Sequence, residues 1–330
     1  MKATWFERKG PAREVLVHGE MPMPEPGAGE VRVRLRVSGV NPTDTKTRGG
    51  WLGNTAMPFP RMITGQDGAG VIDRVGPGVP SAREGERVWV YEAYLGRAFG
   101  TLAEFVVVPA RNAVRLPDGI DDDTGAGLGV PALTAHRCLF IDGPIHGRTV
   151  LVQGGGGGVG HAAIQLARWA GARVIATVSR QAQQDAVLAA GAHLVVNRKT
   201  QQVVDDVRKA TGGRGVDRIV EVAFDENIQT DADMLAVGGA IATYSAGPVP
   251  LPPIPFFTLM RNSHTVHFVL VYTMGDHAHD AAVRDVTACL EAGAYRTHVG
   301  ARFPLTEAAA AHEAQDSGAL VGKILVDVQA

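Results

Sequence analysis

The sequence has little cysteine, no long apolar run and no excess charge of either sign. Cys138 and Cys289 are the only cysteines among its 330 residues, too few for a disulfide framework or a four-cysteine zinc site. No apolar run approaches the ~18 residues of a membrane-spanning helix, and residues 1–8 lack the apolar core of a signal peptide. These absences predict a reduced, soluble protein of the cytoplasm.

The charges nearly cancel, with 32 Lys and Arg against 34 Asp and Glu. Such a balance gives no electrostatic attraction to nucleic acid or to an anionic membrane, so we expect neither as a partner. Hydrophobic residues make up 45% of the chain and charged residues 20%, as in a folded globular protein. At about 150 residues per domain, the length predicts two domains.

Up to about residue 120, short strands alternate with glycine and proline. Apolar residues at 31, 33, 35 and 37 alternate with Arg32, Arg34 and Arg36, which predicts a strand with its arginines on a wet face. Further strands are expected at 71–72, 88–90, 105–108 and 114–116. This half of the sequence therefore predicts a barrel-like β domain.

From about residue 125, strands and helices alternate, which is typical of a doubly wound parallel sheet. Strands are expected at 149–152, 173–178, 194–196, 218–222 and 240–244, and helices at 159–170 and 181–190. Two later helices, near 280–292 and 306–317, and a strand at 323–328 follow. These last elements either extend the sheet or return to the first domain, and periodicity allows both.

Glycine is in excess, since 41 of the 330 residues are glycine, or about 12% against an average of ~7%. Five glycines stand together from Gly154 to Gly158. Gly155, Gly157 and Gly160 fit the pattern G-x-G-x-x-G between a predicted strand and a predicted helix that begins near Val159. Such glycines permit a tight turn, a close approach of backbone N–H groups to a pyrophosphate, and close packing of helix on strand. We therefore predict a dinucleotide site rather than a flexible linker.

The end of the next strand indicates which dinucleotide binds. An NAD site usually has an acidic residue there, whereas this strand ends in Ser179 and Arg180. A hydroxyl and a guanidinium suit the 2′-phosphate of NADPH. The alternative is that Arg180 merely begins a solvated helix.

Several segments carry a family resemblance: residues 39–44 (GVNPTD), 65–71 (GQDGAGV), 129–135 (GVPALTA), 171–172 (GA), 322–325 (GKIL) and the glycine loop. In this order, and over essentially the whole chain, the sequence resembles the zinc-independent quinone oxidoreductase (zeta-crystallin-like) branch of the medium-chain dehydrogenase/reductase superfamily. The resemblance implies an α/β protein with a GroES-like β-barrel catalytic domain at 1–125, a doubly wound Rossmann domain at 126–268, and a return to the catalytic domain at 269–330. It also implies an active site in the cleft and a homodimer joined through the Rossmann domain.

The resemblance also bears on metal binding. Zinc-dependent relatives carry ligands where this sequence has Asn41, Gln66 and Leu128, so no metal is expected, because an amide and an aliphatic group do not make a zinc site. The histidines at 264, 267, 277 and 279 are interpreted as surface or loop residues.

Residue roles implied by the resemblance are as follows. Asn41, Asp44 and Thr134 would lie beside the nicotinamide and the substrate, although each also fits a structural role, as a turn residue next to Pro42 or a helix-interior hydroxyl. The pyrophosphate would be held by Gly157, Gly158 and Val159, and the 2′-phosphate by Ser179 and Arg180, with Arg198 as a second charge. Tyr91 and Tyr94 would stack on a quinone or else be exposed loop tyrosines.

The predicted function is NADPH-dependent reduction of quinones by hydride transfer without a metal. Without a Lewis acid, the acceptor must already be electrophilic. One alternative is a reductase of enone or 2-alkenal double bonds, which needs a proton donor for carbon. Another is an NADPH-binding protein with weak catalysis.

Overall fold

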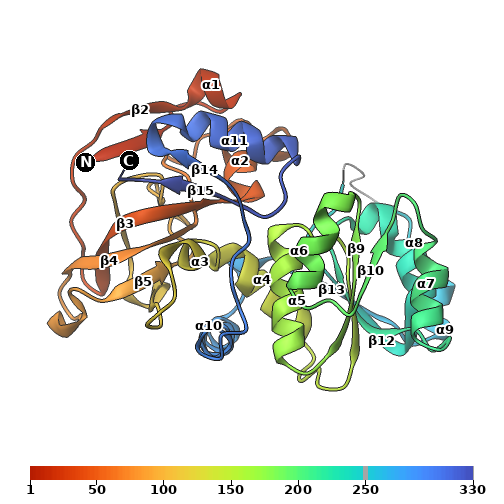
Figure 1. Cartoon of the computed structure of the whole chain (residues 1–330). Helices are drawn as coiled ribbons and strands as arrows, with labels where there is room; N and C mark the ends of the chain where they lie inside the picture. The colour runs from red at the N-terminus through yellow and green to blue at the C-terminus, as the bar shows by residue number, and fades with distance from the viewer. Residues whose placement is uncertain (248–251, 330) are drawn as a thin grey trace. The chain divides into compact units, whose positions relative to one another are not determined.

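The computed structural model describes residues 1–247 and 252–329 (Figure 1). They form two compact units, one of Met1–Val130 with Arg296–Ala330 and one of Pro131–Tyr295. The second junction thus lies at 295/296, later than the expected 268/269. The reason is that helix α10 (Asp276–Glu291) packs on helix α5 (Gly158–Trp169) of the second unit. In addition, Asp285 Oδ2 of α10 lies 2.9 Å from Nε2 of His136 in helix α4 (Gly129–Phe140).

The first unit is built on an antiparallel arrangement around the long strand β3 (Glu30–Val40), which pairs with β4, β6 and β15. The strand order is β14-β15-β3-β4-β5-β7, with β6 also on β3. Among the described residues, the hydrogen-bonded strand pairs do not include β7 with β14. The remaining strands are β1 (Lys2–Trp5), β2 (Val17–Glu20), β4 (Asp67–Val75), β5 (Arg87–Val90), β6 (Phe105–Pro109), β7 (Ala113–Arg115), β14 (Val299–Pro304) and β15 (Lys323–Asp327).

The alternation along β3 has the predicted effect on its apolar face, where Val31, Val33 and Leu35 are fully buried. Arg34 and Arg36 are exposed as expected. The expectation is wrong for Arg32, which is only 8% exposed, because carboxylates surround its guanidinium. Nη2 donates to Asp73 and Nη1 to Glu25, each at 2.9 Å.

Short helices complete the first unit, and its C-terminal part settles a question that periodicity left open. Helix α11 (Ala308–Ser317) packs on α1 (Ala12–Val15) and α2 (Pro42–Gly49), and β15 pairs with β3. Residues 296–329 therefore return to the first unit, whereas α10 belongs to the second. Helix α3 (Asp122–Ala126) packs on β3, β4 and β5, and α4 (Gly129–Phe140) begins at the junction.

The second unit contains a parallel sheet in the order β10-β9-β8-β11-β12-β13. This is the doubly wound order predicted from the sequence, and it reverses between β8 and β11. Helix α5 packs on β8 and β9 and helix α6 (Gln184–Ala189) on β10, as the reader can follow in Figure 1. The strands are β8 (Thr149–Val152), β9 (Arg173–Val178), β10 (Leu194–Asn197), β11 (Val216–Glu221), β12 (Leu235–Thr243) and β13 (Thr265–Phe268).

The helices of this unit follow the strands as a doubly wound fold requires. Within residues 1–247 and 252–329, none of the helices combines the length and the apolar character needed to cross a bilayer. Besides α10 and most of α4 they are α5 (Gly158–Trp169), α6 (Gln184–Ala189), α7 (Val203–Ala210), α8 (Phe224–Met234) and α9 (Phe256–Arg261).

Candidate functional site

The glycine loop joins β8 to α5 at the point where the strand order reverses. Gly154 has φ of +69°, a left-handed conformation that favours glycine. A Cβ on Gly160 would lie 2.3 Å from the carbonyl oxygen of Gly154, so a side chain there would force the helix away from the turn. The predicted strand–turn–helix is therefore present, and two of its glycines are required by the backbone itself.

The glycines of the loop fall into two groups. Gly155 and Gly160 are buried, and a Cβ on Gly155 would lie 3.1 Å from both Ala176 and Ile164. Gly157 is exposed, Gly158 and Val159 are half-buried, and a Cβ on Gly157 would meet only the Gly154 oxygen, at 3.5 Å. The N-terminus of α5 thus presents accessible backbone, where unpaired N–H groups and the helix dipole favour an anion. These residues fit the pyrophosphate of a dinucleotide.

A buried chain of hydrogen bonds holds this loop from below. Gly154 N donates to Thr177 Oγ1 at 3.1 Å, and that hydroxyl donates to Gln153 Oε1 at 2.7 Å. Gln153 Nε2 donates in turn to Asp231 Oδ1 at 2.8 Å. Asp231 is fully buried beside Glu221; burial, and then the charge of Glu221, raises the pKa of Asp231 well above its ordinary value.

Sequence reasoning missed this chain of contacts. Asp231 lies on α8, far from the glycine motif in the sequence, and nothing in the local pattern connects them. The one available signal is a polar residue, Gln153, directly after the apolar residues 150–152 of β8.

The residues expected at the 2′-phosphate meet at one edge of the sheet. Ser179 and Arg180 follow β9, and Arg198 follows β10, where its backbone N donates to the carbonyl of Val178 at 2.9 Å. The amide oxygen of Gln183 accepts hydrogen bonds from the backbone N of Ser179 at 3.0 Å and of Arg180 at 3.1 Å. This contact fixes the turn that carries the hydroxyl and the guanidinium.

Arg198 has an acidic neighbour. Its guanidinium lies 3.7 Å from Glu226 Oε2, with about half of each side chain exposed. A partly screened ion pair of this kind is weak, so Arg198 is available to an anionic ligand at small cost.

A second polar cluster, buried in the first unit, is built around Asn41, Asp67 and Lys323. Lys323 Nζ donates to Asn41 Oδ1 at 2.5 Å and to Asp67 Oδ2 at 3.0 Å, and Asn41 Nδ2 donates to the same Asp67 oxygen at 2.7 Å. All three are at most 5% exposed. Asp67 and Lys323 were not among the predicted site residues, although both lie in segments that carried the family resemblance.

Asp44 has a structural place in the same region. It is fully buried; Oδ2 accepts from the backbone N of Asn41 at 2.7 Å and Oδ1 from that of Gly65 at 3.1 Å. Burial, and then the charge of Asp67, raises the pKa of Asp44 to about 6. The contact with Asn41 is part of a capping box at the start of α2.

The remaining expected contact residues are also buried. Thr134, on α4, is 4% exposed. Tyr91 and Tyr94 are 3% and 7% exposed, so the alternative of exposed loop tyrosines is wrong. Tyr94 donates its hydroxyl hydrogen to Thr47 Oγ1 at 3.3 Å.

The positions that carry zinc ligands in zinc-dependent relatives have other contacts here. Asn41 contacts the Lys323 ammonium, the Gln66 amide oxygen accepts from the backbone N of Tyr94 at 3.3 Å, and Leu128 is fully buried. Within the part of the chain that the structure describes, no three His, Cys, Asp or Glu side chains are grouped to hold a metal ion.

Two of the histidines interpreted as surface or loop residues have other surroundings. His267 lies in β13, where its Nε2 is 2.8 Å from Asp142 Oδ2. His279 is only 6% exposed on α10, so its assignment to the surface is wrong.

Comparison with known proteins matches both units. The family described as "Alcohol dehydrogenase GroES-like domain" matches residues 27–118, and that described as "Zinc-binding dehydrogenase" matches residues 158–288. The quinone oxidoreductase of Rattus norvegicus is 32% identical, over 93% of this chain and 91% of the relative. The 2-haloacrylate reductase of a Burkholderia sp is 30% identical, over 100% of this chain and 99% of the relative.

Solved structures agree with these relatives. The quinone oxidoreductase from Thermus thermophilus, also solved as a complex with NADPH, is 31% identical with a TM-score of 0.83, over 99% of this chain and 100% of the other. An NAD-dependent alcohol dehydrogenase is 29% identical with a TM-score of 0.89, over the same shares. The predicted fold class, a GroES-like domain with a Rossmann domain, is confirmed. The relatives show an oxidoreductase and support a nicotinamide cofactor. The protein belongs to the zeta-crystallin-like quinone oxidoreductase branch of the medium-chain dehydrogenase/reductase superfamily.

Proposed function

We propose that the protein uses NADPH to reduce quinones by hydride transfer without a metal. The observation that carries the proposal is the Asn41–Asp67–Lys323 cluster. The Lys323 ammonium contacts Asn41 and Asp67, and both stand in segments that carry zinc ligands in zinc-dependent relatives. One matching family is described as zinc-binding, yet positions 41, 66 and 128 hold Asn, Gln and Leu, and an amide and an aliphatic group are not zinc ligands.

The chemistry then requires an acceptor that is electrophilic without a Lewis acid. When bound, the reduced nicotinamide supplies a hydride, and one further proton converts a quinone to a hydroquinone. The proton goes to oxygen, which exchanges with water rapidly, so a dedicated acid is not needed. In this proposal, the chain contributes orientation and exclusion of water.

NADPH is preferred over NADH in this proposal because Ser179, Arg180 and Arg198 stand together at the ends of β9 and β10. No acidic residue ends β9, and the NADPH complex of the Thermus relative is consistent with this choice. Gly157, Gly158 and Val159 would hold the pyrophosphate at the start of α5. Asn41 and Thr134 would contact the nicotinamide or the acceptor.

A second candidate is the reduction of a carbon–carbon double bond conjugated to a carbonyl group. The observation that favours it is the 2-haloacrylate reductase, which matches the full length of the chain. Here the proton must go to carbon, a slow transfer that benefits from a fixed donor. The two candidates therefore differ in how much one side chain matters.

The test follows NADPH absorbance with 1,4-benzoquinone, a naphthoquinone and a 2-alkenal, in the unmodified protein and in Thr134→Val, Tyr94→Phe and Asp44→Asn. For a quinone reductase we expect each substitution to cost less than the ~10²–10⁴-fold typical of a lost general acid. Loss of 2-alkenal turnover alone in one variant would favour the alkene reductase. Absence of NADPH consumption with every acceptor would leave only a cofactor-binding protein.

We also propose a homodimer joined through the second unit. β13 is an edge strand of the parallel sheet, and Phe268 on it is 76% exposed. Phe257 and Met260 on α9 are 68% and 58% exposed, and Val237 on β12 is 79% exposed. Exposed apolar side chains beside an unpaired strand edge are typical of a surface that a partner covers.

Sedimentation velocity tests the dimer. Phe268→Lys combined with Phe257→Lys should convert it to a monomer, whereas Phe99→Lys, a matched change at a 37% exposed phenylalanine of the first unit, should not. A monomer in the unmodified protein would refute this part of the proposal.

A further inference from the structure

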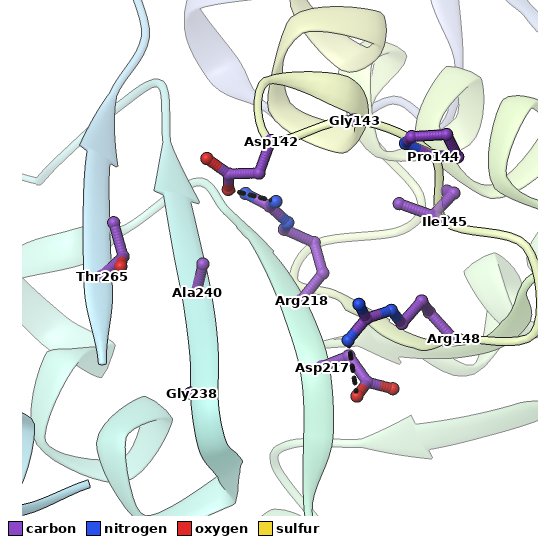
Figure 2. Close-up of a pocket in the computed structure, with 10 residues that line it drawn as sticks. All are labelled: Asp142, Gly143, Pro144, Ile145, Arg148, Asp217, Arg218, Gly238, Ala240 and Thr265. Carbon is purple, nitrogen blue, oxygen red and sulfur yellow. Dashed lines mark hydrogen bonds and ion pairs between the residues drawn. The ribbon is translucent and has the colours of Figure 1, made fainter. Parts of the chain in front are cut away.

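A pocket of about 160 Å³ lies in the second unit, at the amino-terminal ends of the central strands. Its walls include Arg148, directly before β8, Asp217 and Arg218 at the start of β11, and the loop of Asp142 and Ile145. Figure 2 shows the Arg218 side chain reaching toward Asp142 and the Arg148 side chain reaching toward Asp217. The glycine loop leaves the other, carboxyl end of β8, so this pocket is separate from the expected cofactor site.

Arg218 is the unusual member of the pocket. It is 5% exposed, and its Nη2 donates to Asp142 Oδ2 at 2.5 Å. Its Nε and Nη1 are buried and have no hydrogen-bond partner. Leaving a buried N–H unsatisfied costs about 1–3 kcal/mol, and more on a charged group, so proteins rarely leave one without a bound water or ion.

The acidic residues of the pocket already have partners. Asp217 accepts from both terminal nitrogens of Arg214, at 2.8 and 2.9 Å, and from the backbone N of Thr149 at 2.7 Å. Asp142 Oδ2 accepts from Arg218 and lies 2.8 Å from His267 Nε2. Among the residues that line the pocket, the guanidinium groups of Arg148 and Arg218 thus balance the carboxylates of Asp142 and Asp217.

We propose that this pocket binds a small oxyanion, held between the guanidinium groups of Arg218 and Arg148. Phosphate and carboxylate share the required chemistry, because the planar array of guanidinium donors matches two oxygens of either group. Such a ligand supplies hydrogen-bond acceptors for the two Arg218 nitrogens that lack a partner. Arg148, whose side chain is 61% exposed and lies 3.5 Å from the Asp217 carboxylate, is the more accessible of the two arginines.

The experiment measures the thermal unfolding midpoint as a function of inorganic phosphate, acetate and sodium chloride at matched ionic strength. A ligand that binds the folded chain alone raises the midpoint in a saturable way. We expect saturable stabilisation by phosphate, by acetate or by both, beyond that of chloride, and the stronger of the two identifies the preferred oxyanion. Equal effects of all three salts would overturn the proposal and leave a pocket that holds water only.

Variants locate the effect. Arg218→Met and Arg148→Gln should each weaken the affinity for the oxyanion by at least about tenfold. Arg261→Gln, the same loss of charge at an exposed arginine, should leave the affinity unchanged. Asp142→Asn should tighten binding of the oxyanion severalfold, since it removes the carboxylate that competes for Arg218. This variant tests the proposal even if Arg218→Met fails to fold.

Arg180→Ala separates this pocket from the expected 2′-phosphate site. Arg180→Ala should retain the stabilisation, and loss of the effect in this variant would overturn the proposal. Stabilisation of unmodified strength in Arg218→Met or Asp142→Asn would overturn it as well. The outcome is independent of whether the protein reduces quinones, because no cofactor or acceptor takes part in the measurement.

Discussion

Lys323 and Asp67 form an ion pair in which both partners are buried, with Nζ 3.0 Å from Oδ2 and side-chain exposures of 5% and 0%. Asn41 bridges them, since its amide oxygen accepts from the ammonium and its amide nitrogen donates to the carboxylate. The backbone N of Val130 donates to the other oxygen of Asp67 at 2.8 Å. A buried charge pair is tolerated only with such additional hydrogen bonds.

Removal of one partner should therefore be more damaging than removal of both charges. Lys323→Met leaves the Asp67 carboxylate buried without a counterion, and we expect a loss of about 3–5 kcal/mol in the free energy of unfolding. Lys323→Met combined with Asp67→Asn should recover much of that loss. Urea unfolding of the four proteins measures the coupling, and additive effects would show that the two residues do not interact.

Cofactor preference should depend on Arg180. A hydrogen bond to a charged group contributes about 1.5–3 kcal/mol, or roughly ten- to a hundredfold in affinity. Arg180→Ala should lose most of the preference for NADPH and leave NADH binding nearly unchanged, as measured by fluorescence titration of both cofactors. Equal affinities in the unmodified protein would contradict the assignment of Ser179 and Arg180.

Two glycines of the loop should respond differently to substitution. Gly160→Ala places a Cβ 2.3 Å from the Gly154 oxygen, so we expect a lower unfolding temperature together with loss of NADPH binding. Gly157→Val has room in the fold, and should leave the unfolding temperature near that of the unmodified protein while abolishing NADPH binding. If Gly157→Val still bound NADPH normally, the pyrophosphate would not lie at this turn.

Asp231 should make a contribution to the stability of the protein that decreases as the pH rises. Its pKa is raised in the folded state, so above the ordinary value of 3.8 the unfolded chain loses a proton that the folded chain keeps. This contribution is complete below that ordinary value and disappears as the pH passes the folded pKa. Asp231→Asn, which is neutral at every pH, should lack this contribution to the fall in unfolding free energy as the pH rises above 3.8.

Part of that slope should remain in Asp231→Asn. Asp44, whose pKa is raised to about 6, contributes with the same sign. An identical pH dependence in the variant and the unmodified protein would show that Asp231 does not carry the proton.

Metal content is a separate test. Purified protein should contain far less than one zinc per chain by elemental analysis, and a chelator should leave NADPH-dependent turnover unchanged. Stoichiometric zinc, with activity lost on its removal, would reverse the interpretation of Asn41, Gln66 and Leu128.

The predictions from the sequence were most accurate where a short stretch of neighbouring residues determines the structure. The glycine loop, with Gly154 in a left-handed turn and α5 directly behind it, follows from a short motif whose backbone geometry leaves few alternatives. The fold class followed from strand and helix periodicity together with a family resemblance. Ser179, Arg180 and Arg198 meet because parallel strands end at one edge.

The predictions failed where distant segments decide the surroundings of a side chain. Arg32 has the spacing of a solvated residue but is buried by Asp73 and Glu25. Asp231 and Lys323 acquire their roles from partners more than seventy residues away in the sequence. Periodicity describes one strand or helix at a time, and therefore contains no information about such pairs.

The placement of β15 between β14 and β3 has a consequence for how the chain folds as it leaves the ribosome. The first unit needs residues 296–329 for an inner strand of its sheet, whereas the second unit is continuous from Pro131 to Tyr295. Domains usually fold in the order of synthesis, but here the second unit has all its strands while the first still awaits β15. During that interval Asp67 lacks the ammonium of Lys323, so the segment made first is the last to reach its final structure.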